Sequence, residues 1–240
     1  MKIKRWWEFL KIPLYLVAPP LCILCKNPVN PEEIICQECK KELEKYLITP
    51  PRCLICGEPM KHRLCLRCRE EKFTFKKVRG VYIYEGPVIE LIELFKYQGL
   101  EKIAEFLGEK MVKLLNELGE VDYVVPVPLH PARKRERGFS QTALLAKVIS
   151  QISGIPFLEA LIRRRYTKSQ TRLGKKERKE NLKNAFFPVD DRIKERSILL
   201  VDDVLTTGVT LNEASSSLLK GGAIRVSGIV GAIARLYLPD

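Results

Sequence analysis

The sequence has 240 residues, of which 46% are hydrophobic, so the chain can bury a real core and is expected to fold without help. This length leaves room for one medium domain and one small domain. The 42 Lys and Arg residues outnumber the 29 Asp and Glu residues by 13, a balance that favours an anionic partner such as a polyphosphate or a nucleic acid over a merely solvated basic surface.

Residues 1–20, MKIKRWWEFLKIPLYLVAPP, begin with basic residues and continue with an apolar stretch. Glu8, Lys11 and Pro13 interrupt this stretch, no small-residue cleavage site follows it, and it is shorter than the roughly 20 residues that a membrane span needs. We therefore expect a helical N-terminal segment, no membrane span, and a cytoplasmic protein.

All eight cysteines lie in the next segment, residues 21–76. They form four Cys-x-x-Cys pairs, namely Cys22 with Cys25, Cys36 with Cys39, Cys53 with Cys56, and Cys65 with Cys68. Two thiolates separated by two residues can turn back onto one metal ion, and two such pairs supply the four sulfur ligands of a closed structural zinc site. The pattern predicts a double zinc ribbon with two structural Zn²⁺ ions.

The spacing favours sequential pairing, with the first four cysteines on one ion and the last four on the other, but it leaves a cross-braced pairing open. Disulfides are the competing interpretation, and a reducing cytosol disfavours them. His62 can also replace one thiolate, although an exposed loop histidine is the more common case. A closed four-thiolate site has no open coordination position, so we expect a role in folding or recognition and not in catalysis.

Residues 77–240 alternate apolar runs with amphipathic stretches, which predicts one further domain. In chain order we expect a strand at 78–84, helices at 87–99 and 100–119, a strand at 121–128, a helix from Gly138 to 154, a strand at 197–203, a helix at 209–222 and a strand at 223–235. Continuous apolar strands that alternate with helices predict a mostly parallel sheet covered on both faces. Ligands bind such sheets at the carboxyl ends of the strands.

The stretch ILLVDDVLTTGVTL, residues 198–211, is the strongest candidate for a binding site. Asp202 and Asp203 are expected at the carboxyl edge of a buried strand, and the turn Thr206-Thr207-Gly208 leads into a helix that begins near Val209. Backbone N–H groups at the start of a helix lack helical partners and bind anions, and a glycine lets a phosphate approach closely. The two carboxylates suit vicinal hydroxyls or a hydrated Mg²⁺ ion. A phosphate site beside a diol site describes a ribose 5-phosphate.

Residues 201–211 resemble the phosphoribosyl-pyrophosphate (PRPP) motif of type I phosphoribosyltransferases. The segment 124–146, VVPVPLHPARKRERGFSQTALLA, is similar to the signature of the ComF family of competence proteins, and FKYQG at 95–99 is similar to a second element of that family. The cysteine-rich segment also matches the zinc module of that family. Ser140 stands where the family often has Asn.

The resemblance implies a type I phosphoribosyltransferase fold and a set of site residues. Asp202 and Asp203 would contact the ribose hydroxyls as the catalytic pair, with Mg²⁺ bound to PRPP. The 5-phosphate would lie against Thr206, Thr207, Gly208, Val209 and Thr210. The pyrophosphate would lie against the loop of Pro126, Val127, Pro128 and His130, with Lys96 and Tyr97 beside it.

Residues 163–184 hold ten Lys and Arg residues and would correspond to the mobile loop that closes over PRPP in the transferases. Such a density of positive charge can neutralise a pyrophosphate leaving group or bind a nucleic-acid backbone. The candidate contacts are Arg133 and Arg137 of the ComF signature and Arg163, Arg164, Arg165, Arg172, Lys175, Lys176 and Arg178 of this interval.

Two hypotheses of different classes follow. In the first, the protein binds PRPP and acts in DNA uptake or processing during natural transformation, with single-stranded DNA and a DNA-uptake or helicase protein as partners. In the second, it is a catalytically active phosphoribosyltransferase of nucleotide metabolism with an unidentified acceptor. An intact acidic pair and Thr-Thr-Gly turn favour PRPP binding under both.

Overall fold

The computed structural model describes residues 19–98, 101–164 and 185–235, which form two compact units, one ending at Tyr46 and the other beginning at Leu47. The expected N-terminal helix lies outside the described residues except for Pro19 and Pro20. The candidate basic contacts that lie outside the described residues are Arg165, Arg172, Lys175, Lys176 and Arg178. The domain limits expected at residues 20 and 76 stay predictions.

The first unit contains one described helix, α2 (Gln37–Glu44), and a turn closed by a bridge between Leu21 and Pro28. Apart from its cysteines, the buried apolar side chains of its described part are Ile35 and Leu43. Because this apolar core is too small to offset the conformational entropy lost on folding, the stability of this unit depends on its cysteines.

The second unit begins with a second cysteine-rich segment and continues into an α/β domain. Its elements are α3 (Leu66–Glu70), β1 (Val78–Ile83), α4 (Pro87–Gln98), α5 (Glu101–Val112), η1 (Leu115–Glu117), β2 (Tyr123–Pro126), α6 (Pro131–Arg137), α7 (Gln141–Ser153), β3 (Leu161–Arg163), β4 (Phe186–Pro188), η3 (Asp191–Ile193), β5 (Ser197–Leu205), α9 (Val209–Lys220) and β6 (Arg225–Ile233).

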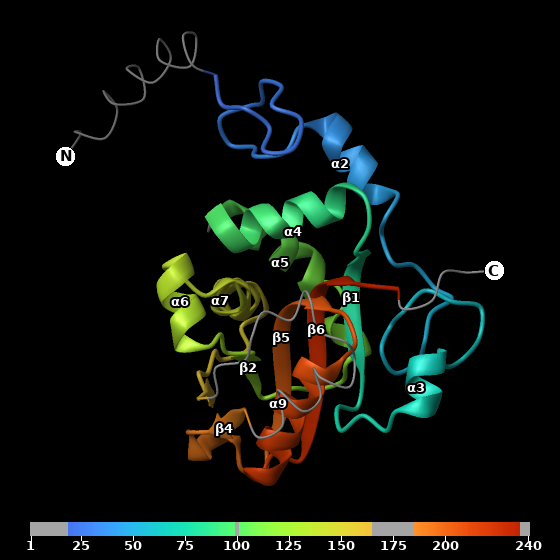
Figure 1. The fold of residues 1–240 in the computed structure, drawn as a ribbon, viewed down its shortest axis with the longest axis vertical. Coiled ribbons are helices and arrows are strands. Elements are labelled where there is room, and N and C mark those ends of the chain that lie inside the picture. Colours follow the sequence, from blue (N-terminus) through green and yellow to red (C-terminus); the bar gives the residue numbers. More distant parts are fainter. Residues whose placement is uncertain (1–18, 99–100, 165–184, 236–240) are drawn as a thin grey trace. The chain divides into compact units, whose positions relative to one another are not determined.

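Four strands form the central sheet in the order β1-β6-β5-β2, and every neighbouring pair is parallel (Figure 1). The strands β5 and β6 are almost entirely buried, as their continuous apolar runs require. A second sheet consists of the antiparallel pair β3 and β4. The carboxyl ends of the four parallel strands therefore lie at one edge of the central sheet.

Helices cover both faces of this sheet. A Cβ atom added at Gly228 of β6 would lie 2.6 Å from Leu211 of α9, whereas one added at Gly231 would lie 3.7 Å from Leu107 of α5. Residues three apart on a strand point to opposite faces, so α9 and α5 lie on opposite sides. The mostly parallel sheet with helices on both faces, preceded by cysteine-rich modules, confirms the expected α/β fold class.

The helix expected from Gly138 onward is wrong at its start, because a helix lies on each side of this glycine. Gly138 has φ 76°, and its N–H donates to the Lys134 carbonyl at 2.9 Å, so it terminates α6. Ser140 then caps α7 by accepting a hydrogen bond from the backbone N–H of Ala143 at 3.4 Å. The helix expected over 100–119 also ends earlier, at Val112.

The other boundaries agree more closely with the sequence. Helix α9 begins at Val209, as expected, while β5 continues past the acidic pair to Leu205. No helix of the described residues is long and apolar enough to cross a membrane.

Candidate functional site

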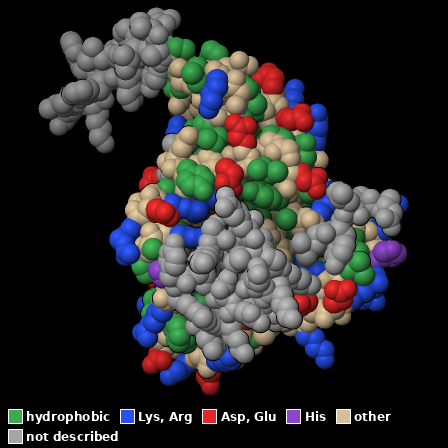
Figure 2. All heavy atoms as spheres, in the orientation of Figure 1, with side chains coloured by type: hydrophobic (Ala, Val, Ile, Leu, Met, Phe, Trp, Pro, Cys, Tyr) green, Lys and Arg blue, Asp and Glu red, His purple; other side chains and the backbone are tan. Residues whose placement is uncertain are grey.

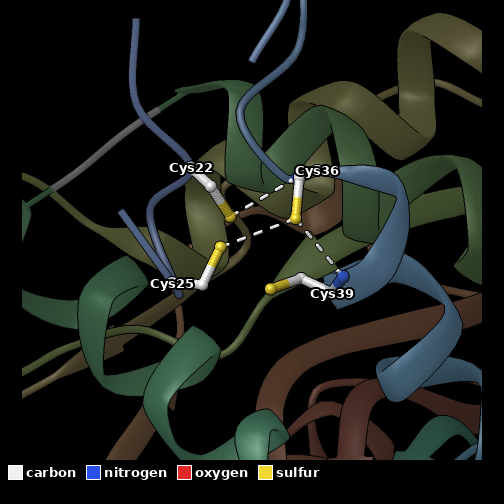
Figure 3. A group of neighbouring side chains, drawn as sticks. All are labelled: Cys22, Cys25, Cys36 and Cys39. Carbon is white, nitrogen blue, oxygen red and sulfur yellow. Dashed lines mark hydrogen bonds between the residues drawn. The ribbon is translucent and has the colours of Figure 1, made fainter. Parts of the chain in front are cut away.

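The eight cysteines form two clusters, Cys22 with Cys25, Cys36 and Cys39 in the first unit, and Cys53 with Cys56, Cys65 and Cys68 in the second. Figure 3 shows the four sulfur atoms of the first cluster converging on one point. The pairing is sequential, so the cross-braced alternative is wrong. None of the eight forms a disulfide, and His62 belongs to neither cluster of the described residues.

The sulfur geometry fits zinc. Within each cluster the four Sγ atoms lie within 4.8 Å of one another, with Cys25 and Cys36 at 3.6 Å and Cys56 and Cys65 at 3.5 Å. A tetrahedral site with zinc–sulfur bonds of about 2.3 Å places its sulfurs about 3.8 Å apart. Backbone N–H groups of Cys36 and Cys39 donate to Sγ atoms of the first cluster, which favours thiolates. Both clusters are therefore closed structural zinc sites.

The acidic pair lies near the carboxyl end of β5 and faces polar side chains from two helices. The Lys96 Nζ atom of α4 lies 3.9 Å from Asp203 Oδ2 and 2.8 Å from Glu93 Oε1. The Gln141 Nε2 atom of α7 donates to Asp203 Oδ2 at 3.4 Å. Segments more than 100 residues apart in sequence thus meet at this edge of the sheet.

The charges in this cluster alter one another's protonation. Burial, and then the neighbouring Asp203 carboxylate, raise the pKa of Asp202 well above its ordinary value. Burial opposes a charged Lys96, but Asp203 and Glu93 outweigh it, so the pKa of Lys96 lies above its ordinary value. The result is a cation held beside two carboxylates at one end of the sheet.

The turn after β5 presents unpaired amide donors. Among the described residues, nothing accepts a hydrogen bond from the backbone N–H of Thr207, Gly208, Val209 or Thr210. Gly208 has φ 83° and no side chain caps the helix that follows. Together with the positive end of α9, these amides form an anion site.

A cavity of about 560 Å³ joins the acidic pair to this turn. The predicted site residues that line it are Lys96, Tyr97, Val127, Pro128, Arg133, Arg137, Arg163, Asp202, Asp203, Thr206 and Thr210. Tyr84, Glu93 and Gln141 line it too and were not predicted. Gln141 stands within the segment 124–146 that is similar to the ComF signature, and that similarity could have singled it out. Glu93 stands within the segment 87–99, and only its place on a helix that faces β5 could have done so.

Other predicted residues lie elsewhere. Pro126 lines a neighbouring cavity of about 680 Å³. His130 caps α6, where its Nδ1 atom accepts a hydrogen bond from the backbone N–H of Ala132 at 3.1 Å. The cavity of about 560 Å³ is lined by Thr206 and Thr210 but not by the residues between them, Thr207, Gly208 and Val209. Arg164 is exposed, and its guanidinium lies over the Phe187 ring.

The lining of the cavity includes Arg133, Arg137 and Arg163 as well as the carboxylates of Glu93 and Glu136. Helix α6 carries Arg133, Lys134, Arg135 and Arg137, and Figure 2 shows Lys and Arg side chains at the edge that α6 occupies. Burial, with repulsion from Arg133, lowers the pKa of Arg163 to about 10. A buried guanidinium that is repelled by a second cation is stabilised by a bound anion.

Comparison with solved structures finds distant likenesses. The glutamine PRPP amidotransferase of B. subtilis is 18% identical with a TM-score of 0.41, over 58% of this chain and 30% of that chain. The purine phosphoribosyltransferase of Pyrococcus horikoshii is 16% identical with a TM-score of 0.35, over 58% of this chain and 85% of that chain.

Sequence relatives are closer. Residues 14–70 match the double zinc ribbon domain family. Competence protein F of Haemophilus influenzae is 32% identical, over 88% of this chain and 96% of its own length. The DNA utilization protein YhgH of Escherichia coli is 33% identical, over 90% of this chain and 91% of its own length. Competence protein ComFC of Bacillus subtilis is 30% identical, over 86% of this chain and 92% of its own length. The chain therefore belongs to the ComF family of competence proteins.

Proposed function

We propose that this ComF protein binds PRPP with Mg²⁺ in the cavity at the end of β5 and acts in the cytoplasm in DNA uptake or processing during natural transformation. One observation carries the binding proposal. Unpaired amides at the start of α9 lie beside two adjacent carboxylates, and one cavity is lined by both carboxylates and by Thr206 and Thr210 at the two ends of the turn. PRPP carries a phosphate and a diol in that relation.

The 5-phosphate belongs at the turn, where the amides of Thr207 to Thr210 and the hydroxyls of Thr206 and Thr210 donate. The carboxylates repel a phosphate but accept hydrogen bonds from ribose hydroxyls. Their oxygen atoms also fit Mg²⁺, which favours one or two carboxylates together with substrate phosphate oxygens. Lys96, which lines the same cavity, would then offset negative charge on the pyrophosphate.

The biological role rests on the relatives, whose names refer to competence and DNA utilization. Zinc-bound thiolates need a reducing compartment, which fits the cytoplasm. The basic edge formed by α6 is suited to the phosphates of single-stranded DNA. A DNA-uptake or helicase protein is the expected protein partner.

Turnover is the second candidate function, and the cavity lining supports it. Arg133 and Arg163 line the same cavity as the acidic pair, so they can neutralise a pyrophosphate leaving group while Asp202 and Asp203 stabilise a cationic ribosyl centre. The reaction would transfer the phosphoribosyl group to a nucleophilic acceptor and release pyrophosphate.

Calorimetry with PRPP and Mg²⁺ tests the binding site. We expect binding by the wild-type protein and loss of binding in the double variant Asp202→Ala with Asp203→Ala. The matched control is Asp190→Ala with Asp191→Ala, which removes another pair of neighbouring carboxylates, at the N-cap and first residue of η3, a helix that does not line the cavity. Unchanged affinity in the Asp202/Asp203 variant would contradict the site.

Turnover has a separate measurement. Labelled PRPP is incubated with the protein, single-stranded DNA and a panel of nucleobases, and pyrophosphate is measured. Release that depends on one acceptor and on Asp202 and Asp203 assigns an enzyme. PRPP binding with no release under any condition leaves the binding role and rejects turnover with these acceptors.

A further inference from the structure

One arginine of the second zinc ribbon reaches the turn assigned to the phosphate. Arg67 lies on α3 between the cysteines Cys65 and Cys68, and its side chain is 1% exposed. Its Nη2 atom donates to Glu58 Oε2 at 2.8 Å and to Cys56 Sγ at 3.6 Å. Its Nη1 atom donates to the carbonyl oxygen of Thr206. One guanidinium therefore joins a zinc ligand to the turn that follows β5.

This contact determines the orientation of a peptide group in the turn. The Thr206 carbonyl and the Thr207 N–H belong to the same planar trans peptide, so they point in opposite directions. Because the carbonyl points at Arg67, the Thr207 N–H points away from the zinc ribbon. Thr207 is one of the unpaired donors of the anion site, so Arg67 fixes the direction of a donor that it does not itself touch.

The segment that follows α3 supports the same turn at two further points. A Cβ atom added at Gly208 would lie 3.0 Å from the Phe73 ring, which is stacked on Phe75 with ring centroids 4.7 Å apart. The backbone N–H of Thr74 donates to Asn212 Oδ1 at 2.7 Å, and its hydroxyl donates to the Asn212 carbonyl at 3.1 Å. The anion site thus lies directly on the zinc ribbon of its own unit.

A buried guanidinium is stable only when negative charge and hydrogen-bond acceptors surround it. Glu58 supplies one charge, and a zinc-bound Cys56 thiolate supplies a sulfur acceptor at a fixed position. When zinc leaves, the four sulfurs are no longer held together and Arg67 loses that fixed acceptor. Groups that hydrogen-bond to metal ligands commonly change metal affinity by about 10- to 100-fold.

We propose that zinc binding at Cys53, Cys56, Cys65 and Cys68 and ligand binding at the turn 206–210 are thermodynamically coupled, with Arg67 as the positioning residue. The proposal rests on the function proposed above, the binding of PRPP. Coupling between two sites is reciprocal. Zinc at this cluster strengthens PRPP binding, and PRPP retains this zinc ion. The first cysteine cluster belongs to the other unit and serves as a comparison.

The test measures both directions of the coupling. In wild-type protein, the zinc released to a chromogenic chelator at equilibrium is measured with and without PRPP and Mg²⁺. We expect PRPP to raise the zinc affinity of one of the two sites by about tenfold, so that less of that ion is released at a given chelator concentration. The variant Cys25→Ser loses a ligand of the first cluster and should keep the PRPP-sensitive ion. This measurement needs no substitution at Arg67, so it holds even where such a variant folds poorly.

Affinity for PRPP is then measured in Arg67 variants. Arg67→Lys keeps the charge but places its three donors on one nitrogen atom and loses the planar fork, and Arg67→Met removes all donors, so both should weaken PRPP binding about tenfold or more and abolish the effect of PRPP on zinc release. Arg69→Met on the same helix is the control, because Arg69 is exposed and its Nε atom donates to the Leu64 carbonyl. It should bind PRPP as the wild-type protein does.

The outcomes separate this proposal from the proposed function. If the wild-type protein binds PRPP but its zinc release is insensitive to PRPP and the Arg67 variants bind normally, the coupling is wrong and the binding site stands. If the wild-type protein does not bind PRPP, the proposed function fails and the coupling fails with it.

Discussion

At the scale of single residues, the site combines two adjacent carboxylates with one half-buried lysine. The Asp203 side chain is 13% exposed and the Lys96 side chain 18% exposed, so these charges interact in a medium less polar than water. Lys96 lies nearer to Glu93 than to Asp203. Lys96 is one cation near three carboxylates, those of Glu93, Asp202 and Asp203, so it cannot neutralise all of their negative charge. The uncompensated charge of Asp203, added to burial, raises the pKa of Asp202.

This raised pKa predicts how stability changes with pH. A carboxyl group with a higher pKa in the folded state binds more protons there than in the unfolded chain, so folding stability falls as pH rises through the window above 3.8. Above the folded-state pKa of Asp202, its charged carboxylate destabilises the folded protein to the full extent. Asp202→Asn removes it, so the variant should unfold at a higher temperature than the wild-type protein at pH 8, and the difference should shrink as pH falls towards 4. Thermal unfolding without ligand measures this.

Asp190 provides a control of opposite sign. Hydrogen bonds from Arg192 hold the pKa of Asp190 below its ordinary value. The stabilisation from such a group is present above its unfolded pKa and is lost as pH falls through the folded pKa. Asp190→Asn should therefore lower stability at pH 8 and have little effect in acid. If the stability change of both variants varied with pH in the same direction, the raised pKa of Asp202 would be contradicted.

At the scale of elements, apolar periodicity identified the four strands of the central sheet and the helices that pack on them. It does not predict α6, because PARKRER contains no repeating apolar face, and it places a helix start at Gly138. The positive φ of Gly138 is a property of the backbone that the letter alone does not specify. The acidic pair and the Thr-Thr-Gly turn were recognised, since their chemistry is local.

The parts of the site that the sequence did not reveal are those that depend on tertiary contacts. Glu93 and Gln141 belong to helices, and packing on β5 determines which side of each helix faces the site. Gln141 contacts Asp203, which lies 62 residues further along the chain. Arg67 stands inside a zinc knuckle, where a basic residue is expected to be exposed, yet it is buried against a turn 139 residues away. No local pattern encodes either contact.

The packing of α5 on α7 makes a prediction at this scale. In an exposed helix Gly→Ala stabilises by about 1 kcal/mol, but a Cβ atom at Gly108 would lie 2.5 Å from Val148 Cγ1 of α7. Valine is stiff in a helix and cannot turn away. Gly108→Ala should therefore destabilise the protein by roughly 1–3 kcal/mol, as overpacking does.

A second substitution makes this test sharper. In a Val148→Ala background the obstructing methyl group is absent, so Gly108→Ala should there stabilise by about 1 kcal/mol, the helix-propensity difference. Urea unfolding of the four proteins of this cycle measures both effects. The same sign of the Gly108→Ala effect in both backgrounds would show that α5 does not approach α7 in this way.

At the scale of the whole molecule, a net charge of +13 accompanies two zinc sites that lie in different compact units. Net charge alone does not distinguish a nucleic-acid surface from a solvated one. The distinction lies in where charge is compensated. Arg192 and Lys194 pair with Asp190 and Asp191, whereas Arg133 lines a cavity that it shares with Arg163, whose pKa is lowered partly by this neighbour.

Affinity for a single-stranded oligonucleotide should therefore fall steeply with salt. Four phosphate contacts give a slope of about −3 in a plot of log affinity against log salt, or roughly a 50-fold loss between 50 and 200 mM salt. Replacing Arg133 and Arg137 by Gln should make the slope shallower by about 1.4. Fluorescence anisotropy over a salt series measures the slope.

The matched control removes the same charge elsewhere. Arg192→Gln with Lys194→Gln lowers the net charge by two at positions already paired with carboxylates, so its slope should stay close to that of the wild-type protein. An equal change in both double variants would mean that DNA responds to net charge and not to the edge formed by α6. A flat salt dependence in the wild-type protein would contradict backbone binding altogether, because release of counterions from the phosphates must accompany it.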